Sequence, residues 1–350
     1  MAYTTIDKPT DYFNTVIYTG TGATQSITVG FQPDLVWGKS RSGSGYHHNL
    51  VDSVRGNTKY LESDRTNAEN TLTDAVTSFT SDGFTLGADA GDREFNENNN
   101  SMVAWNWLAG NGTASNSNGS ITSTVSANTT SGFSIVSYTG TGSNATVGHG
   151  LGSTPKMVIC KNRSSGSVGW SSWHTGIGDG NNYILLNTTQ STLTASNIWN
   201  STIPTSSVIS VGSHPSTNES GSNMIAYCFA EKKGYSKFGS YTGNGNADGT
   251  FVYTGFSPSF YMIKRTDTTG AWIIKDNLRP GYNVNGSYLV ANDSIAEATG
   301  SGNLATDELS NGFKIRGTSS ALNTSGGTYI YYAVAESPFT TSTGIPTTAR

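Results

Sequence analysis

The segment Tyr18-Thr-Gly-Thr-Gly22 recurs as Tyr138-Thr-Gly-Thr-Gly142 and as Tyr241-Thr-Gly-Asn-Gly245. This recurrence is the clearest indication of the architecture of the chain. The stretch has good turn chemistry. A strand can end on the tyrosine, and glycine adopts the positive φ angles of a tight turn without steric cost. The repetition therefore predicts three related units, each with the same strand and turn near its start.

Two further segments recur with this turn. A proline is followed by an apolar run, a lysine and a nearby arginine, in the sets Pro33, Lys39 and Arg41, then Pro155, Lys161 and Arg163, then Pro258, Lys264 and Arg265. Each copy also closes alike, at residues 103–107, 225–229 and 330–334. A unit of roughly 100 to 120 residues can hold its own core. We therefore predict domains over residues 1–109, 131–234 and 235–350, joined between the first two by a linker at 110–130.

The composition indicates an all-β protein. Glycine accounts for 42 of 350 residues, aromatic residues for 11% and charged residues for only 13%. Disordered chains lack aromatic and β-branched residues, and this chain is rich in both, so its Ser, Thr and Asn belong to turns and outward strand faces. Many short strand-like runs bounded by turn residues are typical of sandwiches and barrels. Each repeat is therefore predicted to be an antiparallel β-sandwich.

The segments between the strand-like runs give weaker signals. Only residues 65–70 and 294–298 could each form a single helical turn. Residues 110–130 are Gly, Ser, Thr, Asn and Ala apart from Ile121 and Val125, which predicts a linker or an extended strand against a neighbour. The connection between repeats two and three, at residues 231–237, is short. It predicts that these two repeats pack firmly together and that repeat one is more independent.

Charge and hydropathy exclude several classes of protein. The net charge is −4 and no basic stripe runs along any segment, so nucleic-acid binding is not expected. No apolar run approaches the length of a membrane span, and the first residues lack the basic and apolar regions of a secretory signal. We expect a protein that is made in a cytoplasm and either stays there or is released by lysis.

The recurring cations allow two interpretations. The lysine of each Pro–apolar–Lys segment can mark where a buried strand emerges into solvent, or the three sites can face a common anionic or carbohydrate partner; we favour the first. Asp52 and Arg55 in repeat one correspond to Asp276 and Arg279 in repeat three, whereas repeat two has His174 in that region. An aspartate and an arginine three residues apart predict a local ion pair.

Aromatic side chains cluster near these segments and are the candidate glycan-binding residues. They are Tyr46, His48, Trp170, Trp173 and Trp272. Flat aromatic faces beside Asn, Ser and Asp are what sugar binding needs. The same residues are what a β-sandwich needs to fill its core, which is the interpretation we favour, with Tyr46 and Trp170 as the members expected to be exposed.

Catalytic and metal signals are weak, so no catalytic, cofactor or metal residue is predicted. The acidic stretch at residues 89–97 has oxygen ligands at loop spacing and could hold Ca²⁺, but a solvated loop is the interpretation we prefer. The histidines show no paired metal-ligand spacing, and no serine, histidine and aspartate stand out as a triad. Cys160 and Cys228 are expected to be buried thiols.

Several longer stretches of the sequence resemble those of a known protein family. Met1-Ala-Tyr-Thr-Thr-Ile-Asp-Lys-Pro-Thr-Asp-Tyr-Phe-Asn14, Gly148-His-Gly-Leu-Gly152 and Tyr329-Ile-Tyr-Tyr-Ala-Val-Ala-Glu-Ser-Pro-Phe339, with the repeated turns, resemble repeat-bearing virion proteins of marine tailed bacteriophages. The resemblance covers essentially the whole chain. It implies lectin-like jelly-roll or concanavalin-like modules and a tail fibre or other structural role, and it supplies no catalytic residues.

Taken with the residue patterns, this resemblance leads to one expected function. We expect a non-enzymatic virion protein without a cofactor, most simply a tail-associated adhesin that binds host-surface polysaccharide as a homotrimer beside other virion proteins. The alternative is a capsid decoration protein that stabilises the shell. A polysaccharide-degrading enzyme would need a cleft with two juxtaposed carboxylates, and the low count of 24 Asp and Glu argues against it.

Overall fold

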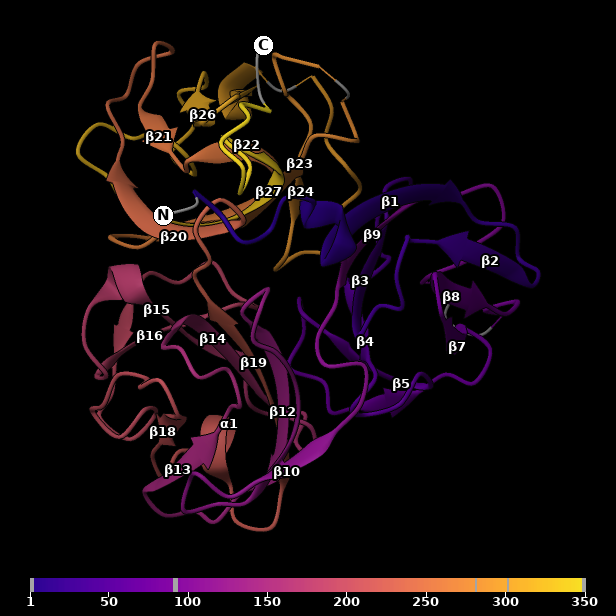
Figure 1. Ribbon diagram of the computed structural model, residues 1–350, viewed down its shortest axis with the longest axis vertical. Helices are drawn as coiled ribbons and strands as arrows, with labels where there is room; N and C mark the ends of the chain where they lie inside the picture. Colours follow the sequence, from indigo (N-terminus) through magenta and orange to yellow (C-terminus); the bar gives the residue numbers. More distant parts are fainter. Residues whose placement is uncertain (1–2, 91–93, 281, 301, 348–350) are drawn as a thin grey trace.

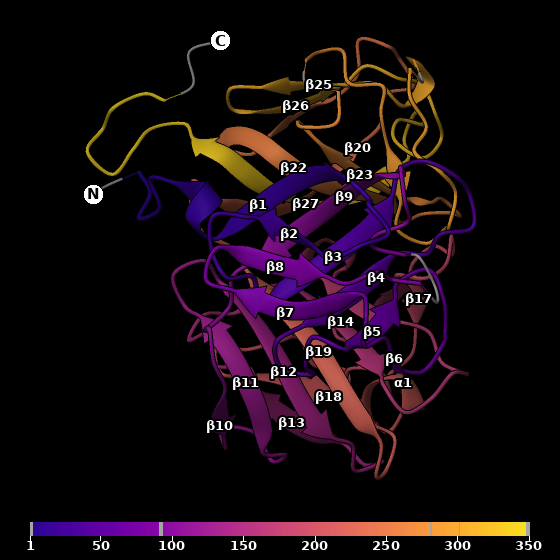
Figure 2. The ribbon, with the colours of Figure 1, turned by 90° about the vertical axis from the view of Figure 1, so that its right-hand side faces the viewer.

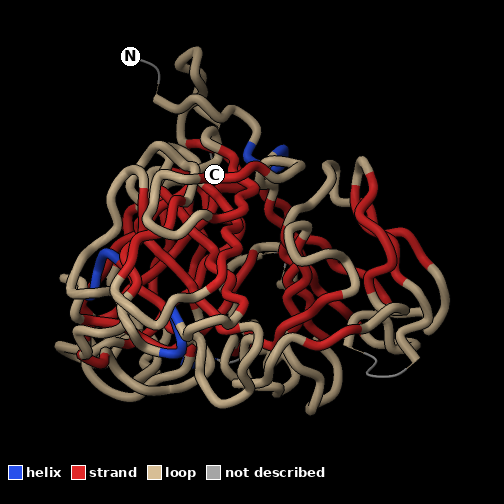
Figure 3. Tube along the Cα trace, turned by 90° about the horizontal axis from the view of Figure 1, so that it is seen from below, coloured by secondary structure: helices blue, strands red, loops and turns tan. Residues whose placement is uncertain are grey.

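The computed structural model describes residues 3–90, 94–280, 282–300 and 302–347. Its secondary structure is 43% strand and 4% helix, and its sheets are antiparallel, as the all-β prediction requires (Figure 3). The described helices are single turns: η1 (Pro9–Asp11), η2 (Thr175–Ile177), α1 (Pro215–Asn218) and η3 (Gly302–Leu304). None of the described helices is long and apolar enough to cross a membrane.

Repeat one forms two sheets that face each other. Its strands are β1 (Phe13–Thr19), β2 (Gln25–Thr28), β3 (Leu35–Ser40), β4 (Asn49–Asp52), β5 (Lys59–Glu62), β6 (Asn70–Thr71), β7 (Val76–Thr80), β8 (Gly83–Leu86) and β9 (Ser101–Trp107). The large sheet has the order β1-β9-β3-β4-β5-β6, and the small sheet has the order β2-β8-β7. Figure 2 shows the small sheet lying in front of the large one.

Repeat two has the same plan with an enlarged sheet. Its strands are β10 (Ala114–Asn116), β11 (Ser123–Asn128), β12 (Phe133–Thr139), β13 (Ala145–Gly148), β14 (Pro155–Asn162), β15 (Ser171–His174), β16 (Asn182–Leu185), β17 (Leu193–Thr194), β18 (Val208–Val211) and β19 (Asn223–Ala230). The large sheet has the order β10-β11-β12-β19-β14-β15-β16-β17, and β13 pairs with β18. Of the two alternatives for residues 110–130, the structure shows the extended strand, because β10 and β11 extend this sheet and Ile121 and Val125 are buried.

Repeat three follows the plan of repeat one. Its strands are β20 (Ser236–Thr242), β21 (Phe251–Tyr253), β22 (Phe256–Arg265), β23 (Trp272–Asp276), β24 (Leu289–Val290), β25 (Thr306–Leu309), β26 (Gly312–Ile315) and β27 (Thr328–Pro338). The large sheet has the order β20-β27-β22-β23-β24, and the small sheet has the order β21-β26-β25. In Figure 1 the three units form three lobes around a common centre.

The strand registers place corresponding residues of the three units at the same positions. Trp37 lies opposite Trp105 on β9 and opposite Leu50 on β4. In the same way Ile159 lies between Tyr227 and Ser172, and Met262 lies between Tyr332 and Ile274. Counting along the strands from these pairs makes His48, Trp170 and Trp272 equivalent, and likewise Asp52, His174 and Asp276.

Each large sheet is buried on both faces. In repeat one, Val36 and Val51 pack with the small sheet, whereas Leu35, Trp37 and Leu50 belong to a core that also contains residues of repeats two and three. Repeat three alternates in the same way between its own core and the shared one. Two-sided burial explains why the run after each proline is continuously apolar instead of alternating.

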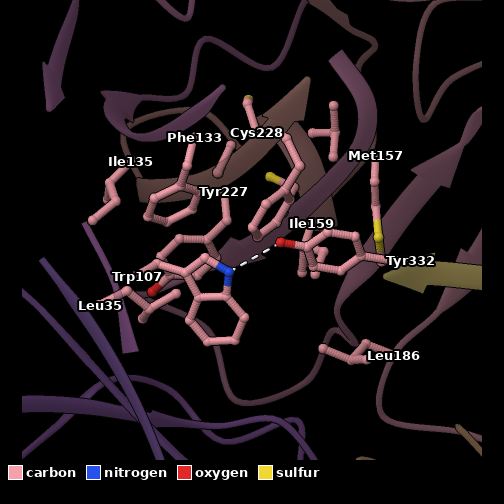
Figure 4. Close-up of a cluster of buried hydrophobic side chains, with 14 of the residues drawn as sticks. Leu35, Trp107, Phe133, Ile135, Met157, Ile159, Leu186, Tyr227, Cys228 and Tyr332 are labelled. Atoms are coloured by element: carbon pink, nitrogen blue, oxygen red, sulfur yellow. Dashed lines mark hydrogen bonds between the residues drawn. The ribbon is translucent and has the colours of Figure 1, made fainter. Parts of the chain in front are cut away.

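The shared core is the largest in the molecule. Figure 4 shows Leu35, Trp107, Ile159, Tyr227 and Tyr332 converging from three sheets, with Trp107 Nε1 donating to the Tyr332 hydroxyl at 3.0 Å. A residual cavity of only about 10 Å³ remains among these side chains, so the centre is closed. The expectation that repeat one is more independent is therefore wrong, because it is packed into the same core as the other two. Whether each predicted domain can fold alone stays a prediction.

The repeated Tyr-Thr-Gly turn has one physical explanation in all three units. The hydroxyl of the tyrosine donates to a carbonyl of the facing loop, as Tyr18 does to Phe95, Tyr138 to Thr217 and Tyr241 to Leu322. The first glycine lies against that loop so closely that a Cβ at Gly140 would stand 2.1 Å from the Glu219 carbonyl oxygen. The second glycine has a positive φ, for example 71° at Gly142.

A buried asparagine follows the carbonyl that each tyrosine contacts. Asn96, Asn218 and Asn323 each accept a hydrogen bond from the main chain of the turn through Oδ1 and donate to loop carbonyls through Nδ2. These asparagines form a third recurring position that the sequence analysis did not identify. Their equal spacing ahead of the closing strand was the available signal.

The prediction of a helical turn is wrong for both segments. Residues 65–70 and 294–298 form extended arms that reach to the next unit. Glu69 N donates to the Arg163 carbonyl, and Glu297 N donates to the Arg41 carbonyl. Repeat two provides the third contact, in which Thr192 N donates to the Thr266 carbonyl. Each unit therefore reaches the next one and repeat three returns to repeat one, which closes a ring.

Candidate functional site

The three equivalent positions His48, Trp170 and Trp272 lie at the junctions between units. Trp170 Nε1 donates to the Glu62 carbonyl of repeat one, and Trp272 Nε1 donates to the Leu185 carbonyl of repeat two, each at 2.9 Å. His48 accepts a hydrogen bond from Trp37 Nε1 at 3.0 Å, and burial lowers its pKa to about 3. These side chains are at most 2% exposed and do not face a glycan, and the two tryptophans hold adjacent units together.

The other two aromatic candidates differ from each other. Trp173 is 4% exposed and donates from Nε1 to the Asp179 carbonyl within its own unit. Tyr46 is half-buried on the loop between β3 and β4. The prediction that Trp170 would be exposed is wrong, because its indole fills the junction between repeats one and two. Of the five candidate glycan-binding residues, Tyr46 is therefore the one whose side chain remains accessible to solvent.

The recurring lysines are buried, contrary to the prediction that they emerge into solvent. Lys161 Nζ donates to the Thr66 carbonyl of repeat one, and Lys264 Nζ donates to the Thr189 carbonyl of repeat two. Lys39 is also fully buried and donates to the Ser40 carbonyl. Burial lowers the pKa of each of these lysines to about 8. They act as buried donors that hold main-chain carbonyls, two of them across a junction.

The predicted Asp–Arg ion pairs are confirmed, and they have a second role. Asp52 pairs with Arg55 and Asp276 with Arg279, and all four charged groups are fully buried. The Tyr227 hydroxyl of repeat two donates to Asp52 Oδ2 at 2.7 Å, and Trp105 Nε1 of repeat one donates to Asp276 Oδ2 at 3.0 Å. The ion pairs are therefore part of the junctions.

His174 occupies the position of those aspartates at the third junction. Its Nε2 is 3.0 Å from the Tyr331 carbonyl of repeat three, and burial lowers its pKa to about 4. The imidazole is therefore neutral at physiological pH and acts as a hydrogen-bond partner. The two cysteines are buried free thiols, as expected, and burial raises the pKa of Cys160 to about 12.

An exposed aromatic that the sequence analysis missed lies in repeat three. Tyr282 is 79% exposed and lines two adjoining hollows of about 460 and 230 Å³. The first hollow is bounded by Ser287 and Thr299, and the second by Asn283 and Glu308. A flat ring with hydroxyl groups in one hollow and amide and carboxylate groups in the other has the chemistry of a sugar-binding platform.

Glu308 is the most constrained polar group of these hollows. Its Oε1 accepts from the Tyr261 hydroxyl at 2.6 Å and from Asn285 Nδ2 at 2.8 Å. Burial raises its pKa despite these hydrogen bonds and the nearby Lys275. Glu336 lines the same hollow and accepts from the Ser257 hydroxyl at 3.1 Å. The two carboxylates are therefore held in place as hydrogen-bond acceptors.

A polar pocket in repeat one is the second site that the sequence analysis missed. Its volume is about 560 Å³, and His47, Glu62 and Glu94 line it. Contact with Asp64 raises the pKa of His47, and burial raises the pKa of Glu94 to about 8. Glu94 belongs to the acidic stretch 89–97, of which residues 91–93 lie outside the described residues. The stretch thus contributes one carboxylate to a pocket whose other walls come from distant segments.

Comparison with known proteins places the chain in a family. A family model described as a domain of unknown function, DUF7483, matches residues 8–338, so this chain belongs to that family. The matched segment runs through all three units as one stretch. No curated protein and no solved structure matches the chain.

Proposed function

We propose that this protein is a non-enzymatic structural protein of a bacteriophage virion, in which it acts as a tail-associated fibre or adhesin that recognises host-surface glycan. The resemblance of the repeated segments to phage virion proteins supports the virion assignment. In this role the chain is made in the host cytoplasm, assembles with other virion proteins and leaves by lysis. Glycan binding needs no catalytic residue and no cofactor.

The main support for the glycan proposal is that Tyr282 is exposed between two polar hollows. A tyrosine ring supplies apolar area for a sugar face at little conformational cost, and the neighbouring Asn283 and Ser287 supply hydrogen-bond partners for hydroxyl groups. The buried aromatics at the junctions are not available for this role. The proposed binding residues therefore differ from the five predicted from the sequence.

Binding of the purified protein to host cells and to host polysaccharide tests this proposal. We expect Tyr282→Ala to weaken binding at least about 10-fold, because truncating an aromatic residue at the centre of a binding site costs roughly 2 kcal/mol or more. Tyr253→Ala is the matched control, since Tyr253 is a 56% exposed tyrosine of the same repeat outside these hollows. Equal binding by the wild type and the Tyr282 variant would contradict the proposal, and release of reducing sugar would indicate an enzyme instead.

A second candidate, a capsid decoration protein, is supported by the closed ring of three equivalent units. A body with internal three-fold repetition matches a three-fold position of a viral shell, where its units would meet three identical neighbours. The number of copies per particle distinguishes the two roles. A small symmetric multiple indicates a tail appendage, and hundreds of copies indicate decoration. The proposed homotrimer is tested by light scattering of the purified chain.

A further inference from the structure

The pocket of repeat one brings metal-ligating side chains together from three distant segments. His47 comes from the loop before β4, Glu62 from the end of β5 and Glu94 from the loop before β9. One ligand atom from each of these residues lies within 4.8 Å of the other two. This spacing allows all three to contact a single ion.

One ring nitrogen of His47 is held by a carboxylate. His47 Nδ1 lies 2.5 Å from Asp64 Oδ2, which leaves Nε2 for another partner. Histidines that bind metals almost always present one nitrogen to the ion and give the other to a carboxylate or carbonyl. The carboxylates are held as well, because Glu62 accepts from Asn67 Nδ2 at 2.8 Å and Glu94 accepts from the His47 main chain at 2.6 Å.

An independent observation is an unsatisfied buried oxygen at the strand position opposite Glu62. Asn49 is fully buried and its Oδ1 has no hydrogen-bond partner, although its Nδ2 donates to the His47 carbonyl. Asn49 lies directly opposite Glu62 in the β4–β5 register, so both side chains leave the same face of the sheet. A buried acceptor without a donor is energetically costly, and a cation would satisfy it.

The equivalent positions in the other units lack every one of these ligands. The registers align His47 with Gly169 and Ala271, Asn49 with Ser171 and Ile273, and Glu62 with Leu185 and Val290. The common scaffold therefore does not require polar groups there. Repeat one alone gathers an imidazole, two carboxylates and an amide oxygen at this place.

We propose that His47, Glu62 and Glu94, with Asn49 Oδ1 beside them, bind one divalent transition-metal ion, for which Zn²⁺ is the best match. An imidazole nitrogen with carboxylate oxygens suits Zn²⁺, whereas Ca²⁺ prefers six or more oxygen ligands. Two carboxylates neutralise the charge of the ion. Arg65, whose Nη1 is 3.6 Å from Glu62 Oε1, has a side chain 46% exposed and can turn to solvent when the ion binds.

Calorimetric titration of the metal-stripped full chain with ZnCl₂ tests this site. We expect one Zn²⁺ per chain, binding at least about 10-fold weaker in Glu62→Gln and in Glu94→Gln, and about 10- to 100-fold weaker in Asp64→Asn, which leaves the ligands themselves intact. Glu231→Gln is the control, because Glu231 pairs with Lys237 in another part of the molecule. Circular dichroism of each variant establishes that it is folded.

Cobalt provides a second readout that does not depend on affinity alone. Co²⁺ bound at the site should give visible d–d absorption, and this absorption should be lost in His47→Ala. Absence of Zn²⁺ binding by the folded wild type, or equal binding by the wild type and both glutamate variants, would overturn the proposal. Preference for CaCl₂ over ZnCl₂ would overturn the assignment to a transition metal.

Discussion

At the scale of single residues, the repeated motifs hold main-chain carbonyls in place. The tyrosine of each turn donates its hydroxyl to a facing loop, and the buried lysines donate to carbonyls at the unit junctions. A buried carbonyl without a donor is costly, so these side chains stabilise loops that sheet hydrogen bonds do not reach. Recurrence in this chain therefore reflects structural roles and not three copies of a binding site.

The first glycine of the turn gives a sharp test of this explanation. Gly140→Ala would place a Cβ 2.1 Å from the Glu219 carbonyl oxygen, so the facing loop must move. We expect the free energy of unfolding to fall by about 2–4 kcal/mol in urea denaturation. Gly166→Ala, where the nearest atom would be 3.5 Å away, should change it by less than about 0.5 kcal/mol. Equal effects of the two substitutions would contradict the explanation.

The buried lysines predict an unusual dependence of stability on pH. Burial lowers the pKa of Lys39, Lys161 and Lys264 to about 8, below the ordinary value of 10.5. Between these two values the unfolded chain binds more protons than the folded one, so the free energy of unfolding should rise with pH. The expected rise from pH 8 to pH 9 is up to about 1 kcal/mol for each lysine.

Denaturation of the wild type and of Lys161→Met at several pH values measures this effect. The variant lacks one titrating group, so its free energy of unfolding should rise less steeply than that of the wild type over the same interval. Above about pH 9 the buried cysteines and tyrosines should favour the unfolded state, because burial raises their pKa values above the ordinary values of 9.0 and 10.0 at which the unfolded chain ionises. A wild-type stability that is flat or falling between pH 8 and pH 9 would refute the prediction.

At the scale of elements, the arms between units determine how the ring closes. Glu69, in the arm at residues 65–70, accepts two hydrogen bonds from Arg163, one from Nε at 2.8 Å and one from Nη2 at 2.9 Å. The corresponding Glu297 pairs with Arg41. Paired hydrogen bonds from a guanidinium fix both distance and orientation. Each arm therefore specifies the position of the neighbouring unit as well as holding it.

A double-mutant cycle on Glu69 and Arg163 measures this contribution. We expect Glu69→Gln and Arg163→Met to show a coupling energy of about 1–3 kcal/mol, because both side chains are largely buried. The same cycle on the more exposed pair Glu231 and Lys237 should give no more than about 1 kcal/mol. A coupling energy near zero for the first pair would show that the arm does not fix the junction.

The elements also show which parts of the fold the sequence can predict. Strands such as β8, β18 and β26 are predictable, because β-branched and aromatic runs between turn residues carry local information. β15 is not predictable from its sequence, because Ser171-Ser-Trp-His174 is polar and lacks that pattern, although packing buries it completely. The arms resembled helical turns because their contacts lie in another unit. Those partners are too far along the chain to influence a local pattern.

The candidate sites were hidden for the same reason. Tyr282 is one tyrosine among 17, and only the surrounding hollows distinguish it. His47, Glu62 and Glu94 are separated in sequence and meet because β4, β5 and the loop before β9 lie side by side. Of the five aromatic residues predicted as glycan-binding candidates, His48, Trp170 and Trp272 are buried. Their role is packing at the junctions between units.

At the scale of the whole molecule, three sheets share one core. Aromatic residues of all three units pack at the centre, from Trp37 and Trp107 to Phe229 and Tyr332. Removing one unit would expose the inner sheet faces of the other two to water, which is costly for apolar surface. The chain should therefore behave as one rigid body.

Scanning calorimetry of the full chain shows whether the three units unfold together. One shared core predicts one cooperative transition, in which the van't Hoff and calorimetric enthalpies agree. Trp107→Ala, which removes a ring that donates to Tyr332, should lower the temperature of that single transition without splitting it. Two or three resolved transitions in the wild type would mean that the units unfold separately, and the account of a closed ring around one core would be wrong.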